Sequence, residues 1–253
     1  MSSITARIRR FLPPWLRPRA GGLGAVIAHD DSLTERILAR VLREDTCAAD
    51  IGCNEGQILR SIVRLAPRGR HHAFEALPAL AAGLRRTFPE VRVHAVALSD
   101  ELGETDFQHV ENDPGYSGLR RRRYDRPDPV VQTIRVPVST LDHELGHDGP
   151  TPPADRIGFL KIDVEGAELQ VLRGAEKTLA RDRPTVIFEH GRGAAEFYGT
   201  TPAAIHALLV DHHGMRIHTL GGFLDQRAPL DLQALQAVFE RGEEWNFVAS
   251  PAP

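Results

Sequence analysis

The stretch DIGCNEG, residues 50–56, follows the short apolar segment TCAA at 46–49 and precedes apolar residues at helical spacing from Ile58 to Leu65. A strand that runs through Asp-x-Gly into a helix is a typical opening unit of an α/β fold. Gly52 and Gly56 would let the backbone turn tightly and approach a ligand closely, because a Cβ would intrude. The stretch therefore predicts a ligand-binding turn at the carboxyl end of the first strand.

Strand and helix patterns alternate along the rest of the chain. Further strands are expected at 70–77, 91–98, 157–164, 184–190, 215–220 and 244–250, and helices after residues 56 and 78 and over 166–181 and 202–213. Such alternation predicts a mostly parallel seven-stranded sheet with helices on both faces. An insertion at 103–156 carries two β-like pieces, ETDFQHV and VVQTIRVPV. We expect a leader and cover helix over 1–45 and one α/β domain over 46–253, with the insertion recognising the substrate.

The composition is that of an ordinary globular protein and argues against a membrane-spanning or disulfide-rich chain. The 253 residues are 42% hydrophobic and 26% charged, and no apolar run approaches the roughly 20 residues that span a bilayer. The formal net charge of -3 gives no reason to expect a nucleic-acid partner. Two cysteines, Cys47 and Cys53, are too few for a disulfide framework. A reducing, cytoplasmic location is the expectation.

The N-terminal segment, residues 1–22, departs from this average. Its first nineteen residues contain five arginines and no acid, with Phe11 and Trp15 among them. Pro13 and Pro14 interrupt the apolar part, so the segment does not resemble a secretory signal. One interpretation is that this segment binds peripherally to the anionic surface at the inner face of a membrane. The other is a poorly ordered leader that packs on its own domain.

The glycine turn indicates what kind of ligand it binds. A nicotinamide dinucleotide site would have glycines where Asn54 and Gln57 stand, which argues against a dehydrogenase. Asp50 would repel a pyrophosphate but suits a cationic ligand. Glu75, at the end of the second strand, is placed to accept hydrogen bonds from two ribose hydroxyls. A nucleoside that carries a positive charge fits both acids, and S-adenosylmethionine is such a ligand.

Five stretches of the sequence occur in an order and at a spacing typical of one enzyme family: DIGCNEG (50–56), AFEALP (73–78), VALSDELGETDF (96–107), FLKIDVEGAELQVLRGA (159–175) and RPTVIFEHG (183–191). Through them the chain resembles the FkbM family of S-adenosylmethionine-dependent methyltransferases. It implies a class I methyltransferase (Rossmann-like) fold and methyl transfer, usually to a hydroxyl of a sugar, glycolipid or secondary metabolite. The family usually has proline directly after the glutamate of the second strand, whereas Ala76 and Leu77 stand here before Pro78.

The resemblance also implies roles around the cofactor. Gly52, Asn54 and Gly56 would line its methionine end, with Asp50 near the ammonium group. Glu75 would hold the ribose. The adenine would meet Leu98, Ser99 and Asp100, although SDELG also reads as a plain turn. GYSGL at 115–119 looks like the family's loop over the cofactor.

A set of acids around the fourth strand supplies the candidate catalytic residues. Asp163 ends that strand, which in the class I order lies beside the first strand, and Lys161 lies on the same face two residues earlier. Glu165 opens the next helix, and Glu189 ends the fifth strand. These carboxylates could orient an acceptor hydroxyl or hold Mg²⁺. The Lys161–Asp163 pair could instead be only a structural salt bridge.

Two further motifs point elsewhere. HELGH, at 143–147, matches the zinc-protease pattern, but Gly146, Gly149 and GPTPP end any helix there, so we expect a short helix capped by Ser139 or Thr140 that exposes both histidines. The run Arg120, Arg121, Arg122 and Arg123 could clamp an anionic acceptor or be a solvated loop.

A catalytically inactive scaffold that binds S-adenosylmethionine is the alternative function.

Overall fold

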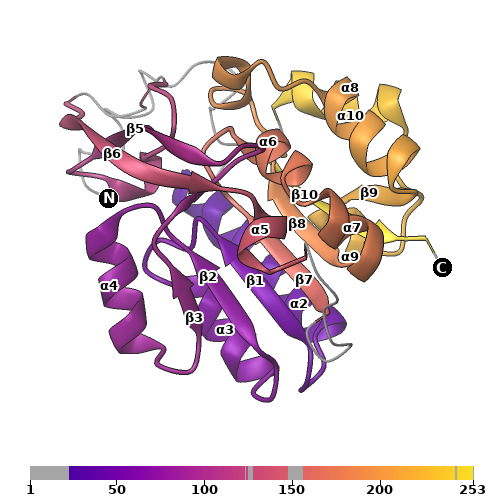
Figure 1. The fold of residues 1–253 in the computed structure, drawn as a ribbon. Coiled ribbons are helices and arrows are strands. Elements are labelled where there is room, and N and C mark those ends of the chain that lie inside the picture. Colours follow the sequence, from indigo (N-terminus) through magenta and orange to yellow (C-terminus); the bar gives the residue numbers. More distant parts are fainter. Residues whose placement is uncertain (1–22, 123, 125–127, 148–155, 243, 253) are drawn as a thin grey trace.

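The computed structural model describes residues 23–122, 124, 128–147, 156–242 and 244–252. Its main sheet has seven strands in the order β3-β2-β1-β7-β8-β10-β9. These are β1 (Cys47–Ile51), β2 (His71–Phe74), β3 (Arg92–His94), β7 (Ile157–Ile162), β8 (Thr185–Glu189), β9 (Met215–Thr219) and β10 (Asn246–Pro251). Among these described strands, β10 runs in the opposite direction to the other six, so its pairs with β8 and β9 are antiparallel and the remaining pairs are parallel. The expected mostly parallel α/β sheet is confirmed (Figure 1).

Helices cover both faces of the sheet (Figure 1). On one face lie α2 (Leu23–Val41), α3 (Gln57–Leu65) and α9 (Leu220–Leu224). On the other lie α5 (Leu141–Glu144), α6 (Glu168–Arg173), α7 (Glu176–Asp182), α8 (Pro202–His206) and α10 (Leu232–Arg241). Helix α4 (Pro78–Thr87) packs with α3 near the β3 edge. None of the described helices is both long and apolar enough to cross a membrane.

Alternation of side chains along the strands explains the two faces. In β1, Ala48 packs with the core under α2, while Ala49 and Ile51 pack with the core on the opposite face. In β8, Ile187 lies on the α2 face and Val186 on the opposite face. Asp50 and Glu189 have the same parity as Ala48 and Ile187, so the polar strand ends fall on the face that α2 covers.

Two strands of the insertion and one that precedes it form a second, three-stranded sheet in the order β4-β6-β5. Its strands are β4 (Ala97–Leu98), β5 (Gly103–Val110) and β6 (Val131–Ser139), and a 3₁₀ turn, η2, covers Pro114–Tyr116. The third strand expected at 91–98 is therefore wrong as one element, because β3 stays in the main sheet while β4 pairs with β6. The β-rich character expected of the insertion is confirmed.

Two expected helices are also interrupted. The helix expected over 166–181 divides into α6 and α7 at Gly174, where a Cβ would lie 2.0 Å from the carbonyl oxygen of Ser99. The helix expected over 202–213 begins as α8 and continues as a π-helix, η5 (Ala207–His212). A 3₁₀ turn, η4 (Ala195–Tyr198), follows β8. The basic segment 1–22, interpreted either as a membrane contact or as a leader that packs on its own domain, lies outside the described residues.

Candidate active site

The glycine turn after β1 is built around three residues in the left-handed backbone region. Gly52, Asn54 and Gly56 have φ values of 76°, 48° and 77°. A Cβ on Gly52 would lie 1.8 Å from the carbonyl oxygen of Asp163, so glycine is needed for close approach as well as for its φ. The Asp163 amide also donates to the Ile51 carbonyl, 3.0 Å away. The glycine turn and the end of β7 are thus held against each other.

Glu75, which follows β2, is fixed by backbone donors. Its Oε2 accepts from the amide of Asn54 and its Oε1 from the amide of Leu77, each at 2.9 Å. Burial raises the pKa of Glu75, and these two amides oppose that shift. The residues inserted before Pro78 therefore leave the acid in place, because Leu77 itself donates to it and Pro78 begins α4. Each carboxylate oxygen keeps a lone pair for a ligand hydroxyl.

A cavity at the carboxyl ends of β1 and β2 joins this turn to the insertion. Its lining includes Gly52, Asn54 and Glu75 from the turn and Leu98, Phe107, Gly115, Ser117 and Leu119 from the second sheet and its loop. The GYSGL loop thus faces the same cavity as the glycine turn. Ser99 and Asp100 do not line it: Ser99 donates to Asp100, which lies 3.9 Å from Arg173. Their contact with adenine stays a prediction.

A second, more polar cavity of about 200 Å³ adjoins the other side of the turn. Asp50 lines it and is only 2% exposed, and its Oδ2 has no hydrogen-bond partner among the described residues. Burial raises the pKa of Asp50 to about 7, while the Lys161 ammonium opposes the shift. A buried carboxylate oxygen without a donor is costly, so this atom fits a ligand that brings its own donor.

The predicted acids converge at the ends of β7 and β8. Carboxylate oxygens of Asp163, Glu165 and Glu189 lie within 4.8 Å of one another, and Lys161 Nζ donates to Asp163 at 3.0 Å. The predicted Lys161–Asp163 pairing is therefore confirmed. Burial and the charge of Asp163 raise the pKa of Glu189 well above its usual value. Burial also raises the pKa of Asp163, but Lys161 and a hydrogen bond with Glu189 outweigh it and lower that pKa overall.

These shifts divide the roles of the two acids. Burial and the charge of Asp163 raise the pKa of Glu189 and so favour its protonated form, whereas Lys161 lowers the pKa of Asp163 and so favours its ionised form. Because the titrations interact, the proton belongs to the pair. Glu168, in contrast, accepts from the amides of Val164 and Gly166 at 3.0 and 3.1 Å, so it fixes the loop that carries Glu165. The arrangement places an acid with a lowered pKa, Asp163, beside one with a raised pKa, Glu189.

The arginine run of the insertion reaches this cluster. Arg122 forms an ion pair with Glu165, and its guanidinium lies 4.8 Å from the ring centre of Tyr116. Burial raises the pKa of Glu165 to about 8, while Arg122 opposes the shift. Arg120 donates to the Phe197 carbonyl at 3.0 Å. Arg121 is exposed, and Arg123 lies outside the described residues. Arg122 and Arg120 thus fasten the insertion to the core, a role that the sequence did not indicate.

HELGH is divided between two local networks. Thr140 caps α5 by accepting a hydrogen bond from the His143 amide. Of the two expected capping residues, Ser139 and Thr140, it is therefore Thr140 that caps the helix. His143 is exposed, but Glu144 bonds to His94 at 2.8 Å. His147 is buried: its ring lies 3.4 Å from the Thr178 hydroxyl and 3.8 Å from a carboxylate oxygen of Asp182.

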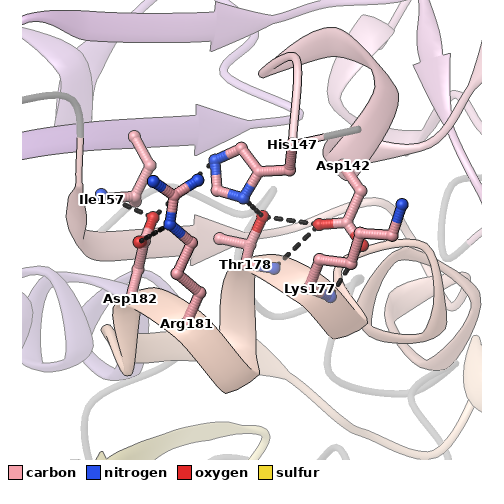
Figure 2. Close-up of polar contacts among 7 residues, drawn as sticks. All are labelled: Asp142, His147, Ile157, Lys177, Thr178, Arg181 and Asp182. Carbon is pink, nitrogen blue, oxygen red and sulfur yellow. Dashed lines mark hydrogen bonds and ion pairs between the residues drawn. The ribbon is translucent and has the colours of Figure 1, made fainter. Parts of the chain in front are cut away.

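The expectation that both histidines are exposed is therefore wrong for His147. Asp142 accepts from the amides of Lys177 and Thr178 and from the Thr178 hydroxyl, so this end of the insertion is tied to α7 (Figure 2). Among the described residues, the group of acids and histidines with metal-binding spacing is Asp163, Glu165 and Glu189. HELGH does not form such a group within that part of the chain.

Sequence reasoning missed one group that lines the polar cavity. Asp30 and Thr34 of α2 and Asn246 of β10 share that cavity with Asp50 and Lys161. Nothing in the local sequence of α2 points to this role. The only signal available was the expectation of a cover helix before the first strand.

The chain is similar in sequence to known proteins over much of its length. The profile of the methyltransferase FkbM domain matches residues 50–217, about two thirds of the chain. The chain is 30% identical over 168 residues to the 2-O-methyltransferase NoeI of Sinorhizobium fredii, which covers 58% of this chain and 65% of NoeI. It is 30% identical over 215 residues to the AMB antimetabolite synthetase AmbE of Pseudomonas aeruginosa, which covers 70% of this chain and 10% of AmbE.

The solved structures are more distant. A crystal structure of methyltransferase FkbM from Methylobacillus flagellatus has 13% sequence identity and a TM-score of 0.48, with 82% of this chain and 44% of that chain covered. The chain spans less than two thirds of the length of each of these three relatives.

Proposed function

The chain belongs to the FkbM methyltransferase family, and from that premise we propose that it transfers the methyl group of S-adenosylmethionine to a hydroxyl of a sugar, glycolipid or secondary metabolite. The observation that carries the proposal is the position of Asp163, which lines both cavities and lies within the group of three acids. The 2-O-methyltransferase NoeI, a relative by sequence, agrees with transfer to oxygen.

The residues present fit S-adenosylmethionine. Glu75 faces one cavity with its carboxylate held by two amides, which suits the two hydroxyls of a ribose. Asp50 faces the adjoining cavity with a buried oxygen that no group in the described part of the chain donates to, which suits an ammonium group. Gly52 lies between the two cavities and lines both. When bound, the cofactor supplies a sulfonium-activated methyl group.

The chain's own residues would handle the acceptor's proton. An alcohol is a weak nucleophile, and the ionised Asp163 can take its proton as the oxygen–carbon bond forms and the sulfur–carbon bond breaks, leaving the electron pair on sulfur. Lys161 keeps Asp163 ionised, and Glu189 can donate to it or to the acceptor oxygen. Proton removal of this kind contributes typically about 10²–10⁴-fold, and positioning of the reactants contributes the larger part.

A metal ion remains a separate proposal for the same acids. Three oxygen ligands within 4.8 Å could hold Mg²⁺. Against this, Lys161 pairs with Asp163 and Arg122 pairs with Glu165, so two cations already neutralise the group. We therefore favour catalysis without metal. Chelation separates the two versions: activity that survives EDTA leaves Asp163 as base, and activity that only Mg²⁺ restores makes it a ligand.

The insertion is our proposal for acceptor recognition. Its loop faces the cavity through Ser117 and Leu119, and Arg122 reaches the acids. An anionic acceptor would bring a group able to compete with Glu165 for the Arg122 guanidinium. Exposed Arg121 adds positive charge nearby. This proposal involves neither nucleic acid nor a membrane. Peripheral membrane binding by the segment 1–22 stays a separate prediction.

The test is a methyl-transfer assay with labelled S-adenosylmethionine and a panel of neutral and anionic sugars, glycolipids and hydroxylated natural products. Asp163→Asn should lower turnover by about 10²-fold or more while S-adenosylhomocysteine affinity stays within a few-fold. Asp45→Asn, at an exposed turn outside both cavities, is the matched control. Normal turnover in Asp163→Asn would leave that residue structural. Cofactor binding with no transfer to any acceptor would favour the inactive scaffold.

A further inference from the structure

The ends of four neighbouring strands present polar side chains to the face that α2 covers. Asp50 pairs in register with Lys161, and Asn246 pairs with Glu189 across β8 and β10. Along β7 and β10, Phe159 and Val248 have the same parity as these polar residues and pack with the core under α2. The strand ends therefore line one side of a polar pocket, and α2 lines the opposite side.

Helix α2 contributes a buried acid to this pocket. Asp30 is 8% exposed and accepts a hydrogen bond from Asn246 Nδ2 at 3.2 Å. It lines the cavity of about 200 Å³ that Asp50 also lines. Asn246 belongs to β10, so a strand far away in the sequence fixes the orientation of the Asp30 side chain. Acidic side chains on a helix usually face solvent and need no such hydrogen bond. The burial and fixed orientation of Asp30 therefore indicate a specific role in the pocket.

The charge balance of the pocket favours a cation. Its acidic lining residues are Asp30, Asp31, Asp50, Glu55 and Asp163. Lys161 is the basic residue in the described lining, and its ammonium donates to Asp163. The Oδ2 atom of Asp50 meanwhile lacks a partner among the described residues. A ligand that brings a compact, multiply donating cation would satisfy both Asp50 and Asp30.

We propose that Asp30 is a cofactor-binding residue that, with Asp50, holds the α-ammonium group of the amino-acid end of S-adenosylmethionine. The proposal rests on the proposed function and deepens it, because it makes α2 a wall of the cofactor site. The family match begins at residue 50, so it assigns nothing to this helix. Asn246 is then a positioning residue that orients the Asp30 carboxylate.

Two ligands isolate the ammonium group. S-adenosylhomocysteine carries the amino-acid end, whereas 5′-methylthioadenosine has the same nucleoside and thioether without it. Isothermal titration of the full chain should show Asp30→Asn weakening S-adenosylhomocysteine by about tenfold or more, as expected for a charge-assisted hydrogen bond. Affinity for 5′-methylthioadenosine should stay within about twofold.

Controls make each outcome decisive. Asp45→Asn removes the same charge from an exposed position outside the cavity and should change neither affinity. Thermal melting of Asp30→Asn shows whether the isosteric variant is folded. Equal weakening of both ligands, or no weakening of either, would overturn the proposal while leaving the proposed function standing. A wild-type chain that binds neither ligand would overturn the proposed function and this proposal together.

Discussion

Replacement of Gly52 by alanine tests the contact between the cofactor turn and the end of β7. The new Cβ would lie 1.8 Å from the carbonyl oxygen of Asp163, so that oxygen must move by more than 1 Å to reach even the 3.0 Å limit of real Cβ contacts. Alanine at a φ of 76° adds about 1–2 kcal/mol of backbone strain. A displacement of roughly 1 Å at reacting groups can cost about 10²-fold in rate.

The matched control is Gly214→Ala. Gly214 has a φ of 61° and nothing within 4 Å of the added Cβ, so it bears the backbone strain alone. Urea denaturation should show both variants losing about 1–2 kcal/mol, with a further loss in Gly52→Ala. Turnover should fall by about 10²-fold in Gly52→Ala and stay near wild type in Gly214→Ala. If both variants keep full turnover and S-adenosylhomocysteine affinity, the reasoning about close approach is refuted.

Two further predictions concern the histidines and the acid cluster. His147→Ala removes a buried ring and should lower the free energy of unfolding by about 1–3 kcal/mol, whereas exposed His143→Ala should change it by less than about 0.5 kcal/mol. Purified wild-type protein should lack stoichiometric zinc by elemental analysis; one zinc per chain that is lost when His143→Ala and His147→Ala are combined would contradict this. The raised pKa of Glu189 means that its contribution to stability is present below its usual pKa of 4.5 and is lost as pH rises through the raised value. Glu189→Gln, which cannot ionise, should therefore lose less stability than wild type as the pH rises above the usual pKa of 4.5, and an identical dependence of stability on pH in urea denaturation would count against that assignment.

The features that could be predicted from the sequence are those set by local spacing. Gly52 and Glu75 stand directly after apolar strands, and parallel strands bring their carboxyl ends to one edge. Lys161 and Asp163, two residues apart, had to share a face of β7, and the ion pair follows from that parity. These inferences need only the period of a strand and the order of the elements.

The features that could not be predicted depend on contacts between distant segments. His147 is buried because Thr178 and Asp182 of α7 receive its ring, and no local pattern reports them. Arg122 lies in a loop whose sequence reads as solvated charge, yet it pairs with Glu165. The position of Asp30 depends on how α2 packs across the sheet ends, which the amphipathic pattern of the helix alone does not fix.

The measurement that tests the central claim most directly is isothermal titration of the wild-type chain with S-adenosylmethionine and, separately, with NAD. The buried oxygen of Asp50, which has no hydrogen-bond partner within the ranges that the structure describes, and the fixed carboxylate of Glu75 suit a cationic nucleoside and oppose a pyrophosphate. We expect S-adenosylmethionine to bind at one site with a Kd on the order of micromolar, about 8 kcal/mol of binding free energy, and NAD to show no heat of binding. Absence of S-adenosylmethionine binding, or tighter binding of NAD, would contradict the account.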